Sequence, residues 1–238
     1  MLSPIIYRYI NPIFSKYFKF VIKRRSEDLA FQRNIILKKY NVSLVLDVGA
    51  HYGETVREIR SNGYTGNIIS IEPTPKSFNV LSKIKDKNMQ AFNIGLGENS
   101  GFLKLNEFEE SYMNSFLEVK KNSRFEMKQL SESLLVECTT LDLFIFEKSL
   151  QNEVIFMKLD VQGFEINVLK GLDKYKDKII ALQVEISINS IYIGASNFLE
   201  LLKWLNENNF RIVSIVTERF NDKQTQAYDV DVLCLRNS

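Results

Sequence analysis

The chain has 238 residues, 45% of them hydrophobic, which is enough to bury the core of one large domain. Its 31 basic and 29 acidic residues leave a net charge of only +2, so no excess of positive charge points to nucleic acid as a partner. A single histidine excludes metal sites built on several histidines, and Cys138 and Cys234 give neither a disulfide framework nor metal-binding spacing. Reduced, buried thiols favour a cytoplasmic protein. No run approaches the roughly 20 apolar residues of a membrane span.

Residues 1–25 differ in composition from the rest of the chain. They are rich in Ile, Tyr and Phe, and basic residues follow the apolar part, an order opposite to that of a secretory signal. Two interpretations stay open: the segment caps the domain or forms a homodimer contact, or it rests on the inner face of a membrane as a peripheral contact. A helix is predicted over 27–40, so we divide the chain into an N-terminal helical extension, 1–40, and a domain, 41–238.

The domain begins with a predicted strand, a glycine turn and a short helix. The apolar run 44–48 predicts a buried strand of a parallel sheet. Gly49 and Gly53 permit a tight turn, and a helix is expected over 54–60 with a stop at 62–63. Because open α/β sheets bind ligands at the carboxyl ends of their strands, this turn is a candidate ligand site. It lacks one glycine of the dinucleotide pattern, which favours a nucleoside with a positively charged amino acid tail, S-adenosylmethionine (SAM).

The remaining chain alternates predicted strands and helices. We expect strands over 66–72, 89–94, 102–105, 134–138, 154–160 and 179–186, and a closing pair over 210–216 and 230–235. Helices are expected from Lys76, over 141–146 with Thr140 as its cap, over 164–170, and after Ser196 as a cap. Residues 95–101 are predicted to be a loop, and 106–133 a long, mobile loop over the substrate. The pattern predicts an α/β fold, doubly wound around a mostly parallel, seven-stranded Rossmann-like sheet with an antiparallel C-terminal hairpin.

Acidic residues stand at the ends of four separate predicted strands, and they are Asp47, Glu72, Asp160 and Glu185. The ends of parallel strands share one edge of a sheet, and a carboxylate buried there needs a cation or hydrogen-bond donors, so we expect a ligand crevice. Glu72 is placed to accept hydrogen bonds from a ribose diol, Asp47 borders the amino acid part of SAM, and Asn93 is expected near the adenine. Asp160 and Glu185 lie across the switch point of the sheet and are expected to face the acceptor.

Several motifs occur in the order that is typical of one protein family. They are Asp47-Val48-Gly49-Ala50-His51-Tyr52-Gly53, Glu72-Pro73, Asn93-Ile94-Gly95, Asn114-Ser115, Thr140-Leu141-Asp142 and Lys158-Leu159-Asp160-Val161-Gln162-Gly163-Phe164-Glu165. Over roughly residues 44–218 the sequence resembles the FkbM family of SAM-dependent methyltransferases, and the block around Asp160 is its most specific part. Two positions depart from the family pattern, because His51 stands where Asn is common and Gln162 where Glu is common.

The resemblance implies transfer of the SAM methyl group to a hydroxyl, often on a sugar or another natural product. The residues that would bind the cofactor are Asp47, Gly49, Ala50, His51, Gly53, Glu72, Pro73 and Asn93. Those expected to contact a small-molecule or glycan acceptor are Asn114, Ser115, Gln162 and Glu165. Asp160, Glu185 and His51 are candidates for the base that activates the hydroxyl. A divalent ion on Asp160 and Glu185 would be another means of activation, although no metal ligand set is predicted.

Other functions stay open at this point. One is a non-catalytic SAM- or nucleotide-binding partner of a glycan assembly system, and the strand-end acids argue against it. Another is a methyltransferase that acts on a different class of small molecule. A nucleic acid substrate is disfavoured, because the four prolines form no amide-clamping Pro-Pro motif and no basic stripe extends beyond residues 16–25.

Overall fold

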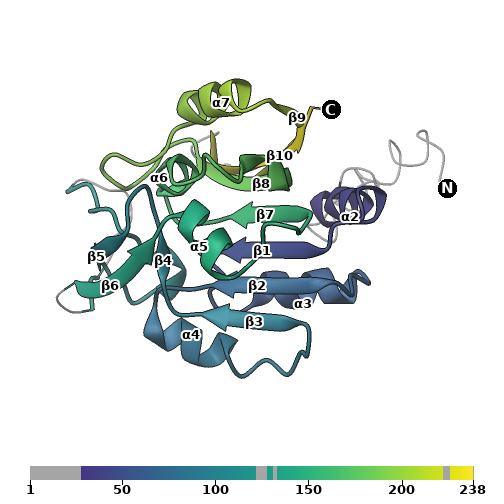
Figure 1. The fold of residues 1–238 in the computed structure, drawn as a ribbon. Helices are drawn as coiled ribbons and strands as arrows, with labels where there is room; N and C mark the ends of the chain where they lie inside the picture. The colour runs from purple at the N-terminus through teal and green to yellow at the C-terminus, as the bar shows by residue number, and fades with distance from the viewer. Residues whose placement is uncertain (1–27, 122–127, 131–132, 222–225, 238) are drawn as a thin grey trace, which may run out of the picture.

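The computed structural model describes residues 28–121, 128–130, 133–221 and 226–237. Its centre is a seven-stranded sheet in which five parallel strands are followed by an antiparallel pair (Figure 1). In spatial order the strands are β3 (Met89–Phe92), β2 (Asn67–Ile71), β1 (Leu44–Val48), β7 (Ile155–Leu159), β8 (Ile179–Ser187), β10 (Gln226–Arg236) and β9 (Phe210–Asn221). The chain reverses its direction of winding between β1 and β7, so the switch point lies there. The predicted fold class is confirmed.

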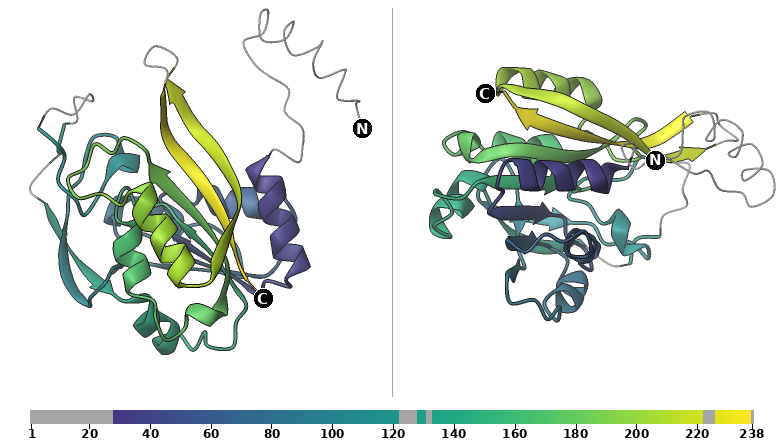
Figure 2. Two further views of the ribbon diagram at one scale, coloured as in Figure 1. Left: turned by 90° about the horizontal axis from the view of Figure 1, so that it is seen from above. Right: turned by 90° about the vertical axis from the view of Figure 1, so that its right-hand side faces the viewer.

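Helices cover both faces of this sheet. Their bounds are α2 (Leu29–Lys39), α3 (Glu54–Ser61), α4 (Pro75–Leu81), α5 (Leu141–Glu147), α6 (Glu165–Lys170) and α7 (Phe198–Glu207). Apolar side chains of α2 and α3 pack with Val45 and Phe156 on one face, and those of α5, α6 and α7 pack with Leu46 and Met157 on the other. Figure 2 shows α2 and α7 on opposite sides of the sheet. Burial on both faces explains why β1 and β7 are almost continuously apolar.

A second, smaller sheet lies beside the first. It contains β4 (Gly95–Leu96), β6 (Leu134–Thr139) and β5 (Gly101–Leu105), with β6 in the centre. The predicted strand near 102–105 is confirmed as antiparallel. The prediction of a loop over 95–101 is wrong at its first two residues, because Gly95 and Leu96 pair with Cys138 and Thr139 far along the chain. The glycines of this segment predict a turn from local sequence, but the pairing of β4 with β6 depends on residues about 40 positions away.

Two helix starts differ from the prediction. The cap of α7 is Asn197 rather than Ser196: its side chain accepts from the backbone N–H of Glu200, whose carboxylate accepts from Asn197 in return. Ser196 is buried, and its hydroxyl donates to the carbonyl of Gly163. Helix α4 begins at Pro75, because proline is tolerated at the first helical position. The predicted cap Thr140 is confirmed, since its hydroxyl accepts from the backbone N–H of Leu143.

The connection 106–133 has structure of its own where it is described. Asn106 and Ser115 form an isolated antiparallel bridge, and Ser111–Met113 form a short 3₁₀ helix between them. Phe108 and Met113 are buried in a small apolar cluster that is separate from the two clusters of the main sheet. Mobility of this connection stays a prediction, and its residues 122–127 and 131–132 lie outside the described residues.

The proposed N-terminal extension is described only from residue 28 onward, so the predictions for residues 1–25 lie outside the described residues. Helix α2 buries Ile36 and Leu37 against the main sheet. Among the helices that the structure describes, none has the length and apolar content that a membrane crossing requires.

Candidate active site

The glycine turn after β1 is fixed by strands on both of its sides. Gly49 has φ +82°, and a Cβ atom built on it would lie 1.9 Å from the carbonyl oxygen of Asp160, so only glycine fits. The backbone N–H groups of Gly49 and Ala50 both donate to the carbonyl of Ile71, at 2.9 and 3.0 Å. The turn therefore joins the ends of β2 and β7 across the switch point, which is where the sequence placed a ligand.

Glu72, which follows β2, is held by backbone groups. Its Oε2 accepts from the N–H of His51 and its Oε1 from the N–H of Thr74, each at 2.8 Å. The side chain is only 5% exposed, and burial raises its pKa although these N–H groups oppose the shift. Asn93 donates to the carbonyls of Glu72 and Pro73, so it fixes this backbone rather than the cavity wall.

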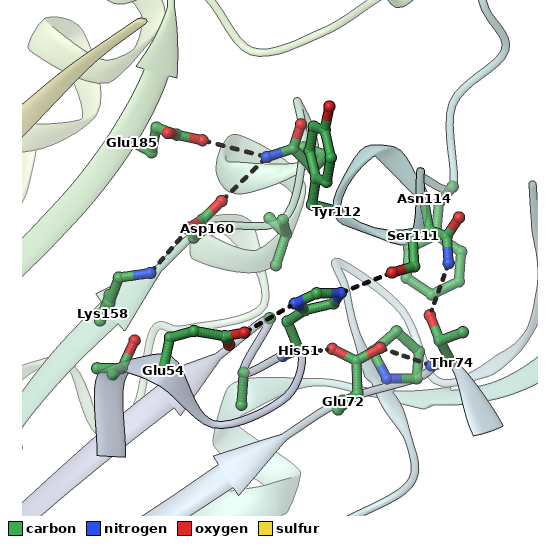
Figure 3. Close-up of a pocket in the computed structure, with 17 residues that line it drawn as sticks. His51, Glu54, Glu72, Thr74, Ser111, Tyr112, Asn114, Lys158, Asp160 and Glu185 are labelled. Carbon is green, nitrogen blue, oxygen red and sulfur yellow. Dashed lines mark hydrogen bonds and ion pairs between the residues drawn. The ribbon is translucent and has the colours of Figure 1, made fainter. Parts of the chain in front are cut away.

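A cavity of about 440 Å³ opens above these strand ends (Figure 3). Of the residues predicted to bind the cofactor, those that line it are Gly49, Ala50, His51, Glu72 and Pro73. Of those predicted to serve the acceptor or the chemistry, those that line it are Asn114, Asp160, Gln162 and Glu185. One cavity at the switch point thus brings together both groups of residues. We call its two sides the Glu72 end (Glu72, His51, Thr74) and the Asp160 end (Lys158, Asp160, Gln162, Glu185).

Side chains hold the acids of the Asp160 end. Lys158 donates to Asp160 Oδ2 at 2.9 Å, and the amide of Gln162 donates to Asp160 Oδ1 and to Glu185 Oε2, each at 3.1 Å (Figure 3). These residues come from β7, the turn after it and β8, which are neighbours in the sheet. Gln162 therefore bridges two carboxyl groups that the sequence separates.

The surroundings move the pKa values of Asp160 and Glu185 in opposite directions. Burial raises the pKa of Glu185 to about 10, and the negative charge of Asp160 adds to the shift. Burial alone would also raise the pKa of Asp160, but the charge of Lys158 and hydrogen bonds from Glu185, Lys158 and Gln162 outweigh it and lower this pKa. Asp160 is consequently the ionised member and Glu185 the protonated member of the pair.

The turn between Asp160 and helix α6 is held by hydrogen bonds with two residues that do not line the cavity, Ser115 and Glu165. Gln162 and Gly163 both have positive φ, +52° and +97°. The Glu165 carboxylate accepts from the N–H of Gly163 at 3.0 Å, and the Ser115 hydroxyl donates to the carbonyl of Gln162 at 2.8 Å. Glu165 and Ser115 are almost fully buried, and burial raises the pKa of Glu165 to about 7. The structure places these two predicted acceptor-binding residues under the turn, where they orient Gln162.

Two predicted cofactor-binding residues also lie beneath the cavity lining. Asp47 is fully buried beside Lys158 on the neighbouring strand, and burial raises its pKa to about 6, with the charge of Lys158 opposing the shift. Neither of its carboxyl oxygens has a hydrogen-bond partner of normal geometry among the described residues. Gly53 precedes α3, and a Cβ there would lie 2.4 Å from the side chain of Ile84. Gly53 therefore serves the packing of α3.

The 3₁₀ helix Ser111–Met113 forms part of the cavity wall. The Ser111 hydroxyl lies 2.8 Å from His51 Nε2 and 3.0 Å from the Tyr52 hydroxyl, and Asn114 donates to the Thr74 hydroxyl at 3.3 Å. Four further residues line the cavity for which no role was predicted from the sequence, and they are Ser111, Tyr112, Thr74 and Lys158. Lys158 had a signal that could have been used: it stands two positions before Asp160, so the two side chains point to the same face of an extended segment.

The fold and the cavity define an α/β protein with a cavity at the carboxyl ends of parallel strands, which is where such folds bind ligands. The sequence profile of the family described as "Methyltransferase FkbM domain" matches residues 47–212. The chain belongs to this family and contains its SAM-dependent methyltransferase domain, which confirms the expected resemblance, enzyme class and cofactor.

Other similarities are more distant. A curated relative named "Methyltransferase 1", from Beauveria bassiana (strain ARSEF 2860), is 26% identical in an alignment 146 residues long that covers 55% of this chain and 59% of the relative. The chain thus spans less than two thirds of that relative. Among solved structures, magnesium protoporphyrin IX methyltransferase from Synechocystis PCC 6803 with bound SAM is similar over 100% of this chain and 99% of that chain, with 9% identity and a TM-score of 0.49. A SAM-dependent methyltransferase from Aquifex aeolicus is similar over 100% of both chains, with 14% identity and a TM-score of 0.44.

The residues of the cavity fit SAM. Glu72 turns a buried carboxylate toward the cavity, where it can accept hydrogen bonds from two ribose hydroxyls. Asp47 adds a buried carboxyl group beneath the cavity, whose negative form would favour a positively charged ligand. Within the described part of the chain, no group of three or more His, Cys, Asp or Glu side chains is arranged to hold a metal ion.

Proposed function

We propose that the enzyme methylates a hydroxyl group of a sugar or of a hydroxyl-rich natural product. The observation that carries this proposal is the Asp160 end of the cavity. It offers a carboxylate, a protonated carboxyl group and a side-chain amide within one hydrogen-bonded cluster. Such groups both donate to and accept from hydroxyls, and they are the polar groups that fix the orientation of a neutral, hydroxylated ligand.

The Glu72 end would hold the cofactor. Glu72 is positioned by backbone N–H groups on both oxygens, so its carboxylate cannot rotate freely, and it would anchor the ribose. When bound, SAM supplies a methyl group on a positively charged sulfur, and the sulfur keeps the electron pair of the bond that breaks. The chain's main contribution would be to hold the acceptor oxygen in line with that bond.

The Asp160 end would then manage the acceptor proton. As the acceptor oxygen gains the methyl group, its proton becomes strongly acidic, so even a carboxylate with a low pKa can take it late in the reaction. Asp160 is ionised and would accept that proton, while Glu185 is protonated and would donate a hydrogen bond. Lys158 keeps Asp160 in its ionised form before the acceptor arrives.

The test is methyl transfer from labelled SAM to a panel of cell-envelope sugars, each paired with a deoxy analogue that lacks one hydroxyl. We expect label in an ether linkage that resists mild base, and loss of labelling with one deoxy analogue. Label that mild base releases, as from a methyl ester, or label on nitrogen would refute methylation of a hydroxyl.

The cellular setting is a proposal from the sequence. The two thiols favour the cytoplasm, and the basic, aromatic residues 1–25 would provide a peripheral contact with a membrane or with a second copy. Flotation with anionic liposomes and light scattering, on the full chain and on a chain without residues 1–25, tests this. If neither measurement changes on deletion, the segment has neither role.

A further inference from the structure

Tyr112 is an aromatic residue that the catalytic proposal does not use. It lies in the 3₁₀ helix Ser111–Met113, lines the cavity, and is 53% exposed. Figure 3 shows its ring on the side of Asp160 and Glu185, with Glu72 at the opposite end of the view. An exposed aromatic ring at the rim of a polar cavity presents a flat apolar surface to whatever enters.

The turn that carries Tyr112 is held on several sides. Met113 is buried with Phe108, Ile191 and Tyr192, and the Tyr192 hydroxyl donates to the carbonyl of Met113. The Ser111 hydroxyl contacts His51 and Tyr52 from the turn after β1. These contacts position the backbone of Tyr112 before any ligand binds. A tyrosine side chain has only two torsions to restrict, so ordering its ring costs little entropy.

The groups facing the same cavity are complementary to this ring. Gln162, Asp160 and Glu185 supply donors and acceptors, whereas Tyr112 supplies an apolar face. A pyranose ring has the matching chemistry, because its C–H groups form apolar faces and its hydroxyls form a polar rim. A flat apolar wall beside planar polar side chains would therefore select ring-shaped, hydroxylated molecules over open-chain ones.

We propose that Tyr112 is the stacking platform for the acceptor, that the acceptor is a pyranose-like ring, and that this contact determines which hydroxyl faces the Asp160 end. The inference rests on the proposed O-methylation and adds to it the shape of the acceptor and a residue that binds it. The edge of the sugar that carries the reacting hydroxyl would point toward Gln162 and Glu185, and one face of its C–H groups would lie on the ring.

The test compares Tyr112→Ala and Tyr112→Phe with the wild type and with Phe102→Ala. Phe102 is a suitable control because it is 66% exposed and does not line this cavity. The probes are methyl glycosides of glucose, mannose and rhamnose, added to protein saturated with S-adenosylhomocysteine. Saturation-transfer NMR identifies which sugar protons touch the protein, and calorimetry measures the affinity for S-adenosylhomocysteine.

We expect saturation concentrated on the C–H protons of one face of at least one probe, and at least a threefold loss of it in Tyr112→Ala. Tyr112→Phe and Phe102→Ala should keep the signal, and all four proteins should bind S-adenosylhomocysteine within twofold of one another. With a sugar that is methylated, the KM of Tyr112→Ala should rise about tenfold while kcat changes less, as expected for a lost stacking contact.

Three results would contradict the proposal that the acceptor stacks on Tyr112. They are no contact of any pyranoside with the wild type, equal saturation in Tyr112→Ala and the wild type, and a clear loss of S-adenosylhomocysteine affinity in Tyr112→Ala. The last result would assign the ring to the cofactor. Failure of the proposed reaction is distinguishable, because it would be seen in the labelled product as a methyl ester or as a methyl group on an atom other than oxygen.

Discussion

The two ends of the cavity hold their carboxylates by different means. At the Glu72 end, backbone N–H groups of two turns contact both oxygens of Glu72. At the Asp160 end, the partners are the side chains of Lys158 and Gln162, and Glu185 lies on the other side of the Gln162 amide. Backbone donors fix geometry and carry no charge that can change. Side-chain partners set the number of protons and the charge. The comparison suggests that the first end is built for binding and the second for chemistry.

The largest effect should come from Asp160→Asn. The substitution keeps the size of the side chain but removes its charge and basicity, so turnover should fall by about 10²–10⁴-fold. Because Asp160 lies away from Glu72, SAM affinity should change by less than about tenfold. Steady-state rates and calorimetry measure the two quantities, and Asp173→Asn, at an 87% exposed carboxylate, is the control. Normal turnover in a folded Asp160→Asn variant would contradict the assignment of the chemistry to the Asp160 end.

Lys158→Met tests whether charge pairing organises the Asp160 end. It leaves Asp47 and Asp160 without their nearest cation, and removing one partner of a buried pair costs about 3–5 kcal/mol. Since the Asp160 side chain is 30% exposed and solvent screens its charge, we expect a smaller loss, about 2–3 kcal/mol, in the free energy of unfolding by urea. Lys170→Met is the matched control, because its ion pair with Glu98 is half exposed. Equal stability of both variants would contradict the pairing.

Glu72→Ala tests the Glu72 end, where we expect a loss of SAM affinity with little change in turnover. It removes one charged acceptor from the proposed ribose contact, so SAM affinity should fall by about 1.5–3 kcal/mol. Turnover at saturating SAM should change much less than in Asp160→Asn. Calorimetry measures the affinity, and Glu54→Ala, at another carboxylate on the cavity wall, is the comparison. Undiminished SAM binding in Glu72→Ala would show that the ribose lies elsewhere.

The last prediction concerns the proton on Glu185 and appears only as a pH dependence. Its pKa in the folded chain, about 10, lies above that of an ordinary glutamate, so between these values the unfolded chain has lost a proton that the folded chain keeps. The stability of the wild type should therefore fall as pH rises through this range. Glu185→Gln has no such proton, so its melting temperature relative to the wild type should increase from pH 5 to pH 9. The half-exposed Glu98→Gln is measured beside it as the control. A difference in melting temperature between Glu185→Gln and the wild type that stays the same from pH 5 to pH 9 would mean that Glu185 is ionised.

The parts of the site that the sequence predicted depend on local chemistry. An apolar run followed by Gly49 defines a strand and its turn, and acids after successive strands must share an edge of a parallel sheet. Glu72, Asp160 and Glu185 could therefore be assigned to one crevice before their distances were known. Local hydrogen bonding also made Thr140 recognisable as a cap, whereas Ser196 and Asn197 are adjacent capping residues, and packing against Gly163 decided between them.

The tertiary structure decided what each side chain does within that crevice. The contact of Gly49 with the carbonyl of Asp160, and the place of Ser115 under Gln162, depend on segments far apart in the chain. Which carboxyl group of the Asp160 end keeps the proton depends on burial and on Lys158, neither of which a strand pattern contains. Tyr112 is one of ten tyrosines in the sequence, and only the fold of its turn places it at the cavity. The order of strands and strand-end acids in the sequence specifies which edge of the sheet carries the site. The charge and exposure of each side chain, and the groups that it contacts, depend on how the chain packs.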